Sequence, residues 1–296
     1  MTLKTLLVIA LLSSGAAATA APAGRIAVVA SFYPLYEFAR QVGGDRVTVR
    51  NLVPAGAEPH DYELTPREVI AVNEARVVIY NGAGLEPWVQ KLLPQVPGRV
   101  VKVNAGDGIQ FMQIGSGQGR GQIDPHVWLD PVLAQRLVDN VLAGLVQADV
   151  SGRAVYEANA AAFKAKLGAL QERTQRTLAP CRKKVFITTH ATFGYFAARY
   201  GLTQFAIAGV TPGAEPSAAK IREILRIVRQ HDIHVIYYET LVSPRVAATI
   251  AREAGARTLV LNPIEGLTGA EVRQGKDYLS VMDENVRSLA QGLDCP

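Results

Sequence analysis

The sequence predicts an α/β protein with two lobes, each containing a roughly four-stranded parallel sheet flanked by helices, joined by one long backbone helix. Short apolar, β-branched runs alternate with stretches of helical periodicity, which is typical of parallel βαβ units. This alternation occurs twice, on either side of a charged, alanine-rich stretch without proline. A chain of 296 residues, 49% hydrophobic and 19% charged, is long enough to bury such cores. We expect a signal peptide at 1–20, a first lobe at 21–147, the linking helix at 148–180 and a second lobe at 181–296.

The first twenty residues have the order of a secretory signal peptide. Lys4 is their only charge, an apolar run follows at 6–12, and Ala18-Thr19-Ala20 forms a cleavage pattern. The apolar run is too short to span a bilayer, and the alternative is an ordinary buried N-terminal helix. Because no cysteine stands directly after the cleavage site, we expect export without a lipid anchor.

Each half of the remaining chain carries its own set of strands and helices. In the first half we expect strands at 26–30, 47–53, 77–80 and 100–103, with helices at 35–42, 66–72 and 85–93. In the second half we expect strands at 185–189, 205–208, 235–238 and 258–261, with helices at 193–200, 217–230 and 244–254. Pro66 fits the first turn of its helix, where proline is accepted.

The stretch between the halves predicts the linking helix. From 149 to 178 there is no proline, and only Gly152 and Gly168 interrupt a composition rich in Ala, Lys, Gln, Glu and Arg. Apolar residues recur there at helical spacing. About 30 residues would span about 45 Å and leave little hinge bending between the lobes. The alternative is two shorter helices broken near either glycine, because glycine lowers helix stability.

The two cysteines can be interpreted once export is expected. Cys181 and Cys295 form an even pair, and a disulfide is the usual state of such a pair in an oxidising compartment. The alternative is two free thiols. A bond would close a loop of more than a hundred residues, which the chain-entropy estimate values at about 4–5 kcal/mol.

The five histidines are the strongest candidates for chemistry. His60 lies in the loop after the second expected strand, His126 lies just before an expected helix, and His190 ends the first strand of the second lobe. Because open parallel sheets bind ligands at the carboxyl ends of their strands, these three could converge between the lobes. Three histidines and one carboxylate can coordinate zinc. His231 and His234 are expected to be surface or capping residues.

No local motif supports this convergence by itself. The histidine separations match no chelating motif such as H-E-x-x-H, and a single histidine is ordinarily a hydrogen-bonded core or surface residue. The formal charge of +5 comes without a run of like charges, which argues against a nucleic-acid partner.

Five runs, in this order along nearly the whole chain after the signal, carry a family resemblance: GAEPHDYE at 56–63, DPHVWLDP at 124–131, TTHATFGYF at 188–196, YYETLVSPR at 237–245 and NPIEGLTGAEVRQGKDYLSVMDENV at 262–286. With these runs the chain resembles the metal-binding solute-binding proteins of zinc and manganese ABC importers, which are periplasmic receptors with a rigid helical linker. The resemblance implies that His60, His126 and His190 bind one divalent metal between the lobes. It also implies that the third histidine favours zinc, whereas manganese receptors tend to carry Glu there.

The fourth ligand departs from the pattern of many family members. They use an Asp from the last strand of the second lobe, and the corresponding residue here is Asn262. Glu265 resembles the carboxylate of zinc receptors with a Pro-Leu-Glu-Gly type of sequence, so we expect Glu265 to be the fourth ligand. A bound water, or a purely structural Glu265, is the alternative. Glu58 and Asp61 could orient the imidazole of His60, or could be solvated loop acids.

The resemblance also departs at a loop. Many zinc receptors carry a His- and acid-rich segment before the second histidine, whereas residues 115–122 here are glycine-rich and contain no histidine. We therefore expect any metal-collecting role of such a loop to be absent or delegated to another protein.

The sequence thus predicts a periplasmic receptor, not an enzyme, that carries Zn²⁺ as transported ligand to an ABC permease and its ATPase. We expect a monomer and allow for a periplasmic zinc metallochaperone as a partner. The alternatives are a receptor for manganese or another divalent metal, an exported zinc-dependent hydrolase, a siderophore or corrinoid receptor, and a metal-loaded adhesin. A hydrolase is disfavoured because neither H-E-x-x-H nor G-x-S-x-G occurs.

Overall fold

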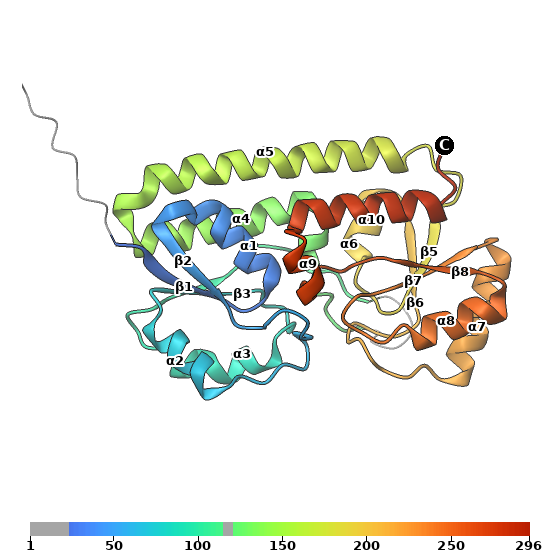
Figure 1. Cartoon of the computed structure of the whole chain (residues 1–296), viewed down its shortest axis with the longest axis horizontal. Helices are drawn as coiled ribbons and strands as arrows, with labels where there is room; N and C mark the ends of the chain where they lie inside the picture. Colours follow the sequence, from blue (N-terminus) through green and yellow to red (C-terminus); the bar gives the residue numbers. More distant parts are fainter. Residues whose placement is uncertain (1–23, 115–120) are drawn as a thin grey trace, which may run out of the picture.

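The computed structural model describes residues 24–114 and 121–296. The predicted signal peptide and most of the glycine-rich segment lie outside these ranges. The described chain forms two α/β lobes side by side beneath one long helix (Figure 1), so the predicted fold class is confirmed. The predicted residue boundaries of the lobes stay predictions.

The first lobe contains a four-stranded parallel sheet in the order β2-β1-β3-β4. Its strands are β1 (Ile26–Ala30), β2 (Val47–Asn51), β3 (Val77–Tyr80) and β4 (Val101–Asn104). Helices α1 (Tyr33–Gly43) and α4 (Pro131–Ala148) cover one face, and α2 (Pro66–Glu74) and α3 (Pro87–Leu92) lie on the other (Figure 1). Both faces are apolar because the central strands are buried on both sides.

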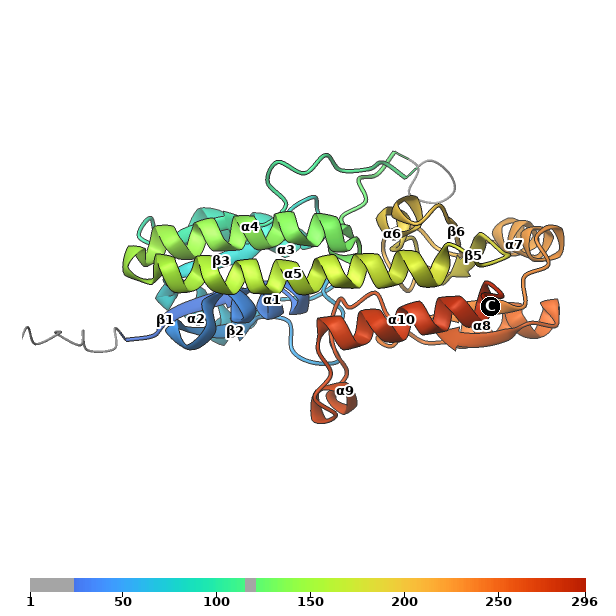
Figure 2. The ribbon, with the colours of Figure 1, turned by 90° about the horizontal axis from the view of Figure 1, so that it is seen from above.

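The second lobe repeats the topology with the order β6-β5-β7-β8. Its strands are β5 (Val185–Thr188), β6 (Thr203–Ala206), β7 (Val235–Tyr238) and β8 (Arg257–Val260). Its helices are α6 (Gly194–Arg199), α7 (Ala218–Gln230), α8 (Arg245–Ala254), α9 (Gly269–Arg273) and α10 (Tyr278–Gly292). Short α9 projects from the body beside the junction of the lobes (Figure 2).

One predicted strand of this lobe had the wrong bounds, and two helices were not predicted. The strand expected at 205–208 lies two residues earlier, because β6 is an edge strand whose register pairs Val185 with Thr203 and Thr188 with Ala206. Its partly exposed residues obscure the apolar pattern, and the buried Ile207 already lies beyond the strand. No range was predicted for α9 or α10, although α10 packs against the linking helix.

The linking helix α5 (Arg153–Leu178) contains 26 residues, about 39 Å at 1.5 Å per residue. A 3-10 turn at Val150–Gly152 precedes it, so Gly152 ends the turn and only Gly168 lies inside the helix. Helix α5 packs on α1 and α4 in the first lobe and on α10 in the second (Figures 1 and 2). Its buried residues recur every three or four positions: Tyr156, Ala160, Phe163, Leu167, Leu170, Thr174 and Leu178.

One apolar core continues from lobe to lobe under α5. The ring of Phe38 in α1 lies 5.5 Å from that of Phe163 in α5 and 5.1 Å from that of Tyr278 in α10, measured between centroids. A shared core resists relative movement of the lobes, because bending would expose these aromatic rings to water. Among the described residues, no helix is long and apolar enough to cross a membrane.

The two ends of α5 are fastened differently. Just before the helix, the Asp149 carboxylate accepts hydrogen bonds from Arg46 at 2.8 Å, from Tyr156 at 2.7 Å and from Ser151 at 2.6 Å. Just after it, Cys181 is bonded to Cys295 near the end of the chain, so the predicted disulfide is confirmed.

Candidate metal site

Four side chains predicted from the sequence meet between the lobes. His60, His126, His190 and Glu265 each offer one ligand atom, and these atoms all lie within 4.8 Å of one another. The Nε2 atoms of the three histidines lie 3.3, 3.1 and 3.4 Å from Oε1 of Glu265, in the order given. Such a group can hold a metal ion.

Each lobe supplies two of the four side chains. His60 lies in the loop after β2, and His126 lies just before the turn Val127–Leu129 that leads into α4. His190 follows β5, and Glu265 lies in the segment after β8. His60, His190 and Glu265 therefore come from the carboxyl ends of parallel strands, where α/β folds bind ligands.

The site is shielded from water. The exposed fraction is 0% for His126 and His190, 1% for Glu265 and 9% for His60. Burial by itself raises the pKa of the Glu265 carboxyl, but the charge of His190 and hydrogen bonds from all three imidazoles outweigh it and hold that pKa well below its usual value. The centre thus keeps an anionic oxygen surrounded by three ring nitrogens.

Two further carboxylates fix the orientation of the imidazoles. Nδ1 of His126 lies 2.8 Å from Asp124, and Nδ1 of His190 lies 2.6 Å from Glu239. Burial lowers the pKa of His190, but the charges of Glu239 and Glu265 raise it well above its usual value. A carboxylate at Nδ1 leaves Nε2 as the atom directed at the centre, which is the common arrangement behind metal-binding histidines.

Sequence reasoning missed both of these carboxylates. Asp124 stands two residues before His126 in the DPH run, which was an available signal. Glu239 is 49 residues from His190 and meets it only because β5 and β7 are neighbours in the sheet.

Glu58 and Asp61 had two possible roles, to orient the imidazole of His60 or to be solvated loop acids. Glu58 accepts a hydrogen bond from the backbone N–H of His60 at 3.2 Å, and Asp61 is exposed. Burial, followed by the charge of Glu265, raises the pKa of Glu58 to about 9.

Asn262 forms hydrogen bonds with its own segment and with Glu271. Its Nδ2 donates to Glu271 at 3.0 Å and its Oδ1 accepts from the N–H of Ile264 at 2.8 Å. The carboxylate from this segment that reaches the three histidines is that of Glu265.

The remaining histidines lie apart from this group. His231 caps the end of α7, and His234 has a side chain that is 60% exposed and pairs with Asp232 at 3.2 Å.

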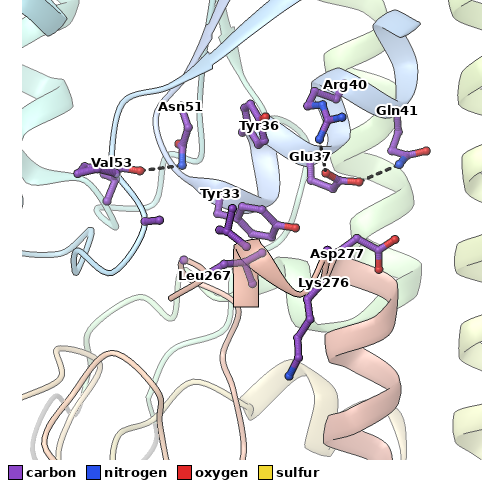
Figure 3. Close-up of a pocket in the computed structure, with 15 residues that line it drawn as sticks. Tyr33, Tyr36, Glu37, Arg40, Gln41, Asn51, Val53, Leu267, Lys276 and Asp277 are labelled. Carbon is purple, nitrogen blue, oxygen red and sulfur yellow. Dashed lines mark hydrogen bonds and ion pairs between the residues drawn. The ribbon is translucent and has the colours of Figure 1, made fainter. Parts of the chain in front are cut away.

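A separate pocket of about 490 Å³ lies between α1 and the segment around α9 (Figure 3) and contains none of the four ligand candidates. Some of its polar groups are bonded to one another or to the backbone. Gln41 donates to Glu37 at 2.8 Å, and Asn51 donates to the carbonyl oxygen of Val53 at 2.7 Å (Figure 3). We assign no ligand to it.

Residues 28–292 match the family model for ZnuA, the periplasmic zinc-uptake complex component A. The chain is 38% identical over 282 residues to the zinc-binding lipoprotein AdcA of Streptococcus pneumoniae, covering 92% of this chain and 56% of AdcA. It therefore spans about half the length of that relative. It is 39% identical to the high-affinity zinc uptake system protein ZnuA of Bacillus subtilis, covering 91% of this chain and 88% of that protein.

Solved structures show the same similarity. The Zn(II)-bound ZnuA-like domain of Streptococcus pneumoniae AdcA superposes with a TM-score of 0.81 at 39% identity, covering 92% of this chain and all of that domain. The laminin-binding protein Lmb of Streptococcus agalactiae, described as a bifunctional adhesin and metal transporter, superposes with a TM-score of 0.82 at 32% identity, covering 90% and 99%.

Proposed function

The chain belongs to the family of periplasmic zinc-uptake components, and on that premise we propose that it is a high-affinity receptor that captures Zn(II) between its lobes and delivers it to an ABC importer. The observation that carries the proposal is the convergence of three imidazole nitrogens and one carboxylate within 4.8 Å, two donors from each lobe.

In this proposal His60, His126, His190 and Glu265 are the four zinc ligands. Three neutral imidazoles and one carboxylate suit the tetrahedral preference of zinc, and leave the bound centre with a net charge of about +1. Asp124 and Glu239, each within ion-pair distance of a ligand imidazole, offset that charge and hold the rings in place.

Four protein donors favour a receptor over a hydrolase. Catalytic zinc sites generally keep one position open for water or substrate, whereas sites that only hold the ion are filled by protein ligands. Burial of the site also favours capture of an ion over access for an organic substrate.

We further propose a periplasmic location without a lipid anchor, a monomeric state, and an ABC permease with its ATPase as partners. AdcA is named a lipoprotein, so this chain would differ from that relative in its anchoring. A periplasmic zinc metallochaperone is an additional proposed partner. The named functions of the zinc-binding relatives support the zinc proposal, and manganese or another divalent ion is the alternative cargo.

Metal stoichiometry after chelation and refilling tests the proposal. The purified chain should bind one zinc ion, prefer it to manganese in competition, and lose it as the pH falls through the histidine range, because the ligands must be deprotonated. A His126→Ala and His190→Ala double variant should bind no zinc tightly. A His231→Ala and His234→Ala variant, which also loses two imidazoles, should bind as the parent does. Tight binding of one zinc by the first variant would overturn the proposal.

A further inference from the structure

Three of the four proposed ligands follow a proline whose carbonyl oxygen accepts a hydrogen bond from a side-chain N–H. The prolines are buried and stand one residue before His60, one before His126 and two before Glu265. The three bonds join Trp88 Nε1 to Pro59 at 3.2 Å, Asn81 Nδ2 to Pro125 at 2.9 Å, and Trp128 Nε1 to Pro263 at 2.8 Å.

Each bond restricts ψ of the proline, the backbone dihedral that the proline ring does not fix. The ring fixes φ of the proline near −65°, but ψ, which sets the direction of the next peptide plane, stays variable. A hydrogen bond to the proline carbonyl fixes that plane. For His60 and His126 this plane leads directly into the ligand residue. For His126, Asp124 also holds the backbone N–H at 3.0 Å and the ring at 2.8 Å, and the N–H of Val127 donates to the same Pro125 carbonyl oxygen at 2.9 Å.

The bond from Trp128 spans the two lobes. Trp128 is fully buried two residues after His126, and its ring lies edge-on to the His126 ring at 5.3 Å between centroids. Its indole donates to Pro263 of the second lobe, and its own carbonyl oxygen accepts from the hydroxyl of Tyr278 at 2.5 Å. One side chain thus contacts a first-lobe ligand and the segment that carries Glu265.

The segment that carries Glu265 needs such support. Ile264 has φ of +59°, a left-handed conformation that is strained for a β-branched residue. Its N–H is held by Asn262, and its side chain is fully buried. A strained backbone persists only where surrounding contacts over-determine it, and the bond from Trp128 is one of these contacts.

We propose that Trp88, Asn81 and Trp128 are positioning residues that set the peptide planes ahead of His60, His126 and Glu265 and so pre-organise the metal site before the ion arrives. This inference rests on the proposed function, because it assigns these residues a role in zinc binding. Loss of contacts that orient ligands typically costs about 10–100-fold in metal affinity.

Double-mutant cycles on zinc affinity test the inference, with the Kd measured by chelator competition. Trp128→Phe removes the indole N–H and keeps an aromatic ring, so it should raise the zinc Kd about 10–100-fold in the parent. In a Glu265→Ala background the same change should alter the Kd less than about threefold, because the carboxylate it positions is gone. Trp88→Phe is the matched control: its effect should persist with Glu265→Ala and vanish with His60→Ala.

The outcomes separate this inference from the proposed function. Equal loss of affinity from Trp128→Phe in both backgrounds would mean that Trp128 acts only on general stability, and would overturn the inference alone. Parental zinc affinity in folded Trp88→Phe and Trp128→Phe variants would overturn it as well. A parent chain that takes up no zinc would overturn the proposed function and the inference with it.

Folding of each variant is checked by thermal unfolding of the metal-free protein. Should Trp128→Phe fail to fold, the cycle of Trp88→Phe with His60→Ala decides by itself, because Trp88 is only partly buried and tolerates the change better. Additive losses in that cycle would overturn the inference.

Discussion

Each lobe places a buried glutamate in the segment that follows its third strand, and the two glutamates make different contacts. In the first lobe Glu86, which follows β3, accepts a hydrogen bond from Ser31 after β1 at 2.6 Å. In the second, Glu239 after β7 accepts one from Thr189 after β5. Both lie where neighbouring strands of the sheet lead away in opposite directions, the usual ligand position of this architecture.

The two carboxylates differ in their second contact. Glu239 lies 2.6 Å from Nδ1 of His190, because that histidine immediately follows Thr189. Glu86 instead accepts the N–H of Asn81 at 2.8 Å, and burial raises its pKa to about 7. The first lobe orients its histidine with Asp124, from another loop. The two lobes thus share a topology and each has a buried glutamate after its third strand, and in the second lobe a histidine lies next to that carboxylate.

The two ends of α5 are also held to their lobes by different interactions. Its start is held to the first lobe by the ion pair of Asp149 with Arg46, and its end to the second lobe by the disulfide of Cys181 with Cys295. The first fastening should be sensitive to acid and the second to reduction.

Removing the covalent fastening should have the largest effect on stability. The bond closes a sequence separation of 114 residues, so a Cys181→Ser and Cys295→Ser variant should lose about 4–5 kcal/mol of unfolding free energy. Guanidinium unfolding of the metal-free protein measures the loss, and the parent with added reductant should match the variant. An unchanged unfolding free energy would show that the second lobe does not depend on the bond.

Removing one histidine from each lobe compares their shares of zinc binding. Structural zinc sites bind with roughly 10–16 kcal/mol, so one of four ligands accounts for about 2.5–4 kcal/mol, or roughly 100–1000-fold in Kd. His126→Ala and His190→Ala should each weaken binding by that factor in a competition titration, and His234→Ala should not. Parental affinity in either variant would show that its lobe contributes no essential donor.

Asp149→Asn tests the ionic fastening of the first lobe. Burial alone would raise the pKa of Asp149, but hydrogen bonds from Ser151, Arg46 and Tyr156 lower it. Because the folded-state pKa is depressed, the stabilisation is present above the unfolded pKa of about 3.9 and is lost as the pH falls through the folded value.

The substitution should therefore cost about 1.5–3 kcal/mol near neutral pH, the range for hydrogen bonds to charged groups. The difference from the parent should shrink below about pH 3. Urea unfolding at both pH values measures it. A difference independent of pH would mean that the charge of Asp149 is not what fastens the helix.

Replacing Glu86 and Glu239 with glutamine tests whether these two buried carboxylates have different roles. Glu239→Gln should raise the zinc Kd about 10–100-fold, because His190 loses the carboxylate behind Nδ1. Glu86→Gln keeps an amide oxygen for Ser31 and Asn81 and should leave the Kd within about threefold. Isothermal titration of both variants measures the contrast, and equal effects would contradict the different roles assigned to the two lobes.

Much of the fold followed from local patterns. The strands were predictable within about two residues because short β-branched runs are bounded by turns and helices. The bounds of the edge strand β6 were two residues off and no range was predicted for the helices α9 and α10, since their patterns depend on which faces neighbouring elements cover. The disulfide was predictable from cysteine count and export, and the distance between its partners along the chain did not matter.

The sequence by itself determined the two-lobed α/β class and the linking helix, because periodicity is a local property of a chain. The three histidines and Glu265 were named as ligand candidates from their positions and from the family resemblance, not from a local motif. Only the tertiary structure decided that Glu239 contacts His190, that Trp128 joins the lobes at Pro263, and that Ile264 adopts a left-handed conformation. These features join segments far apart in sequence, and the packing of the two sheets under α5 sets which segments meet.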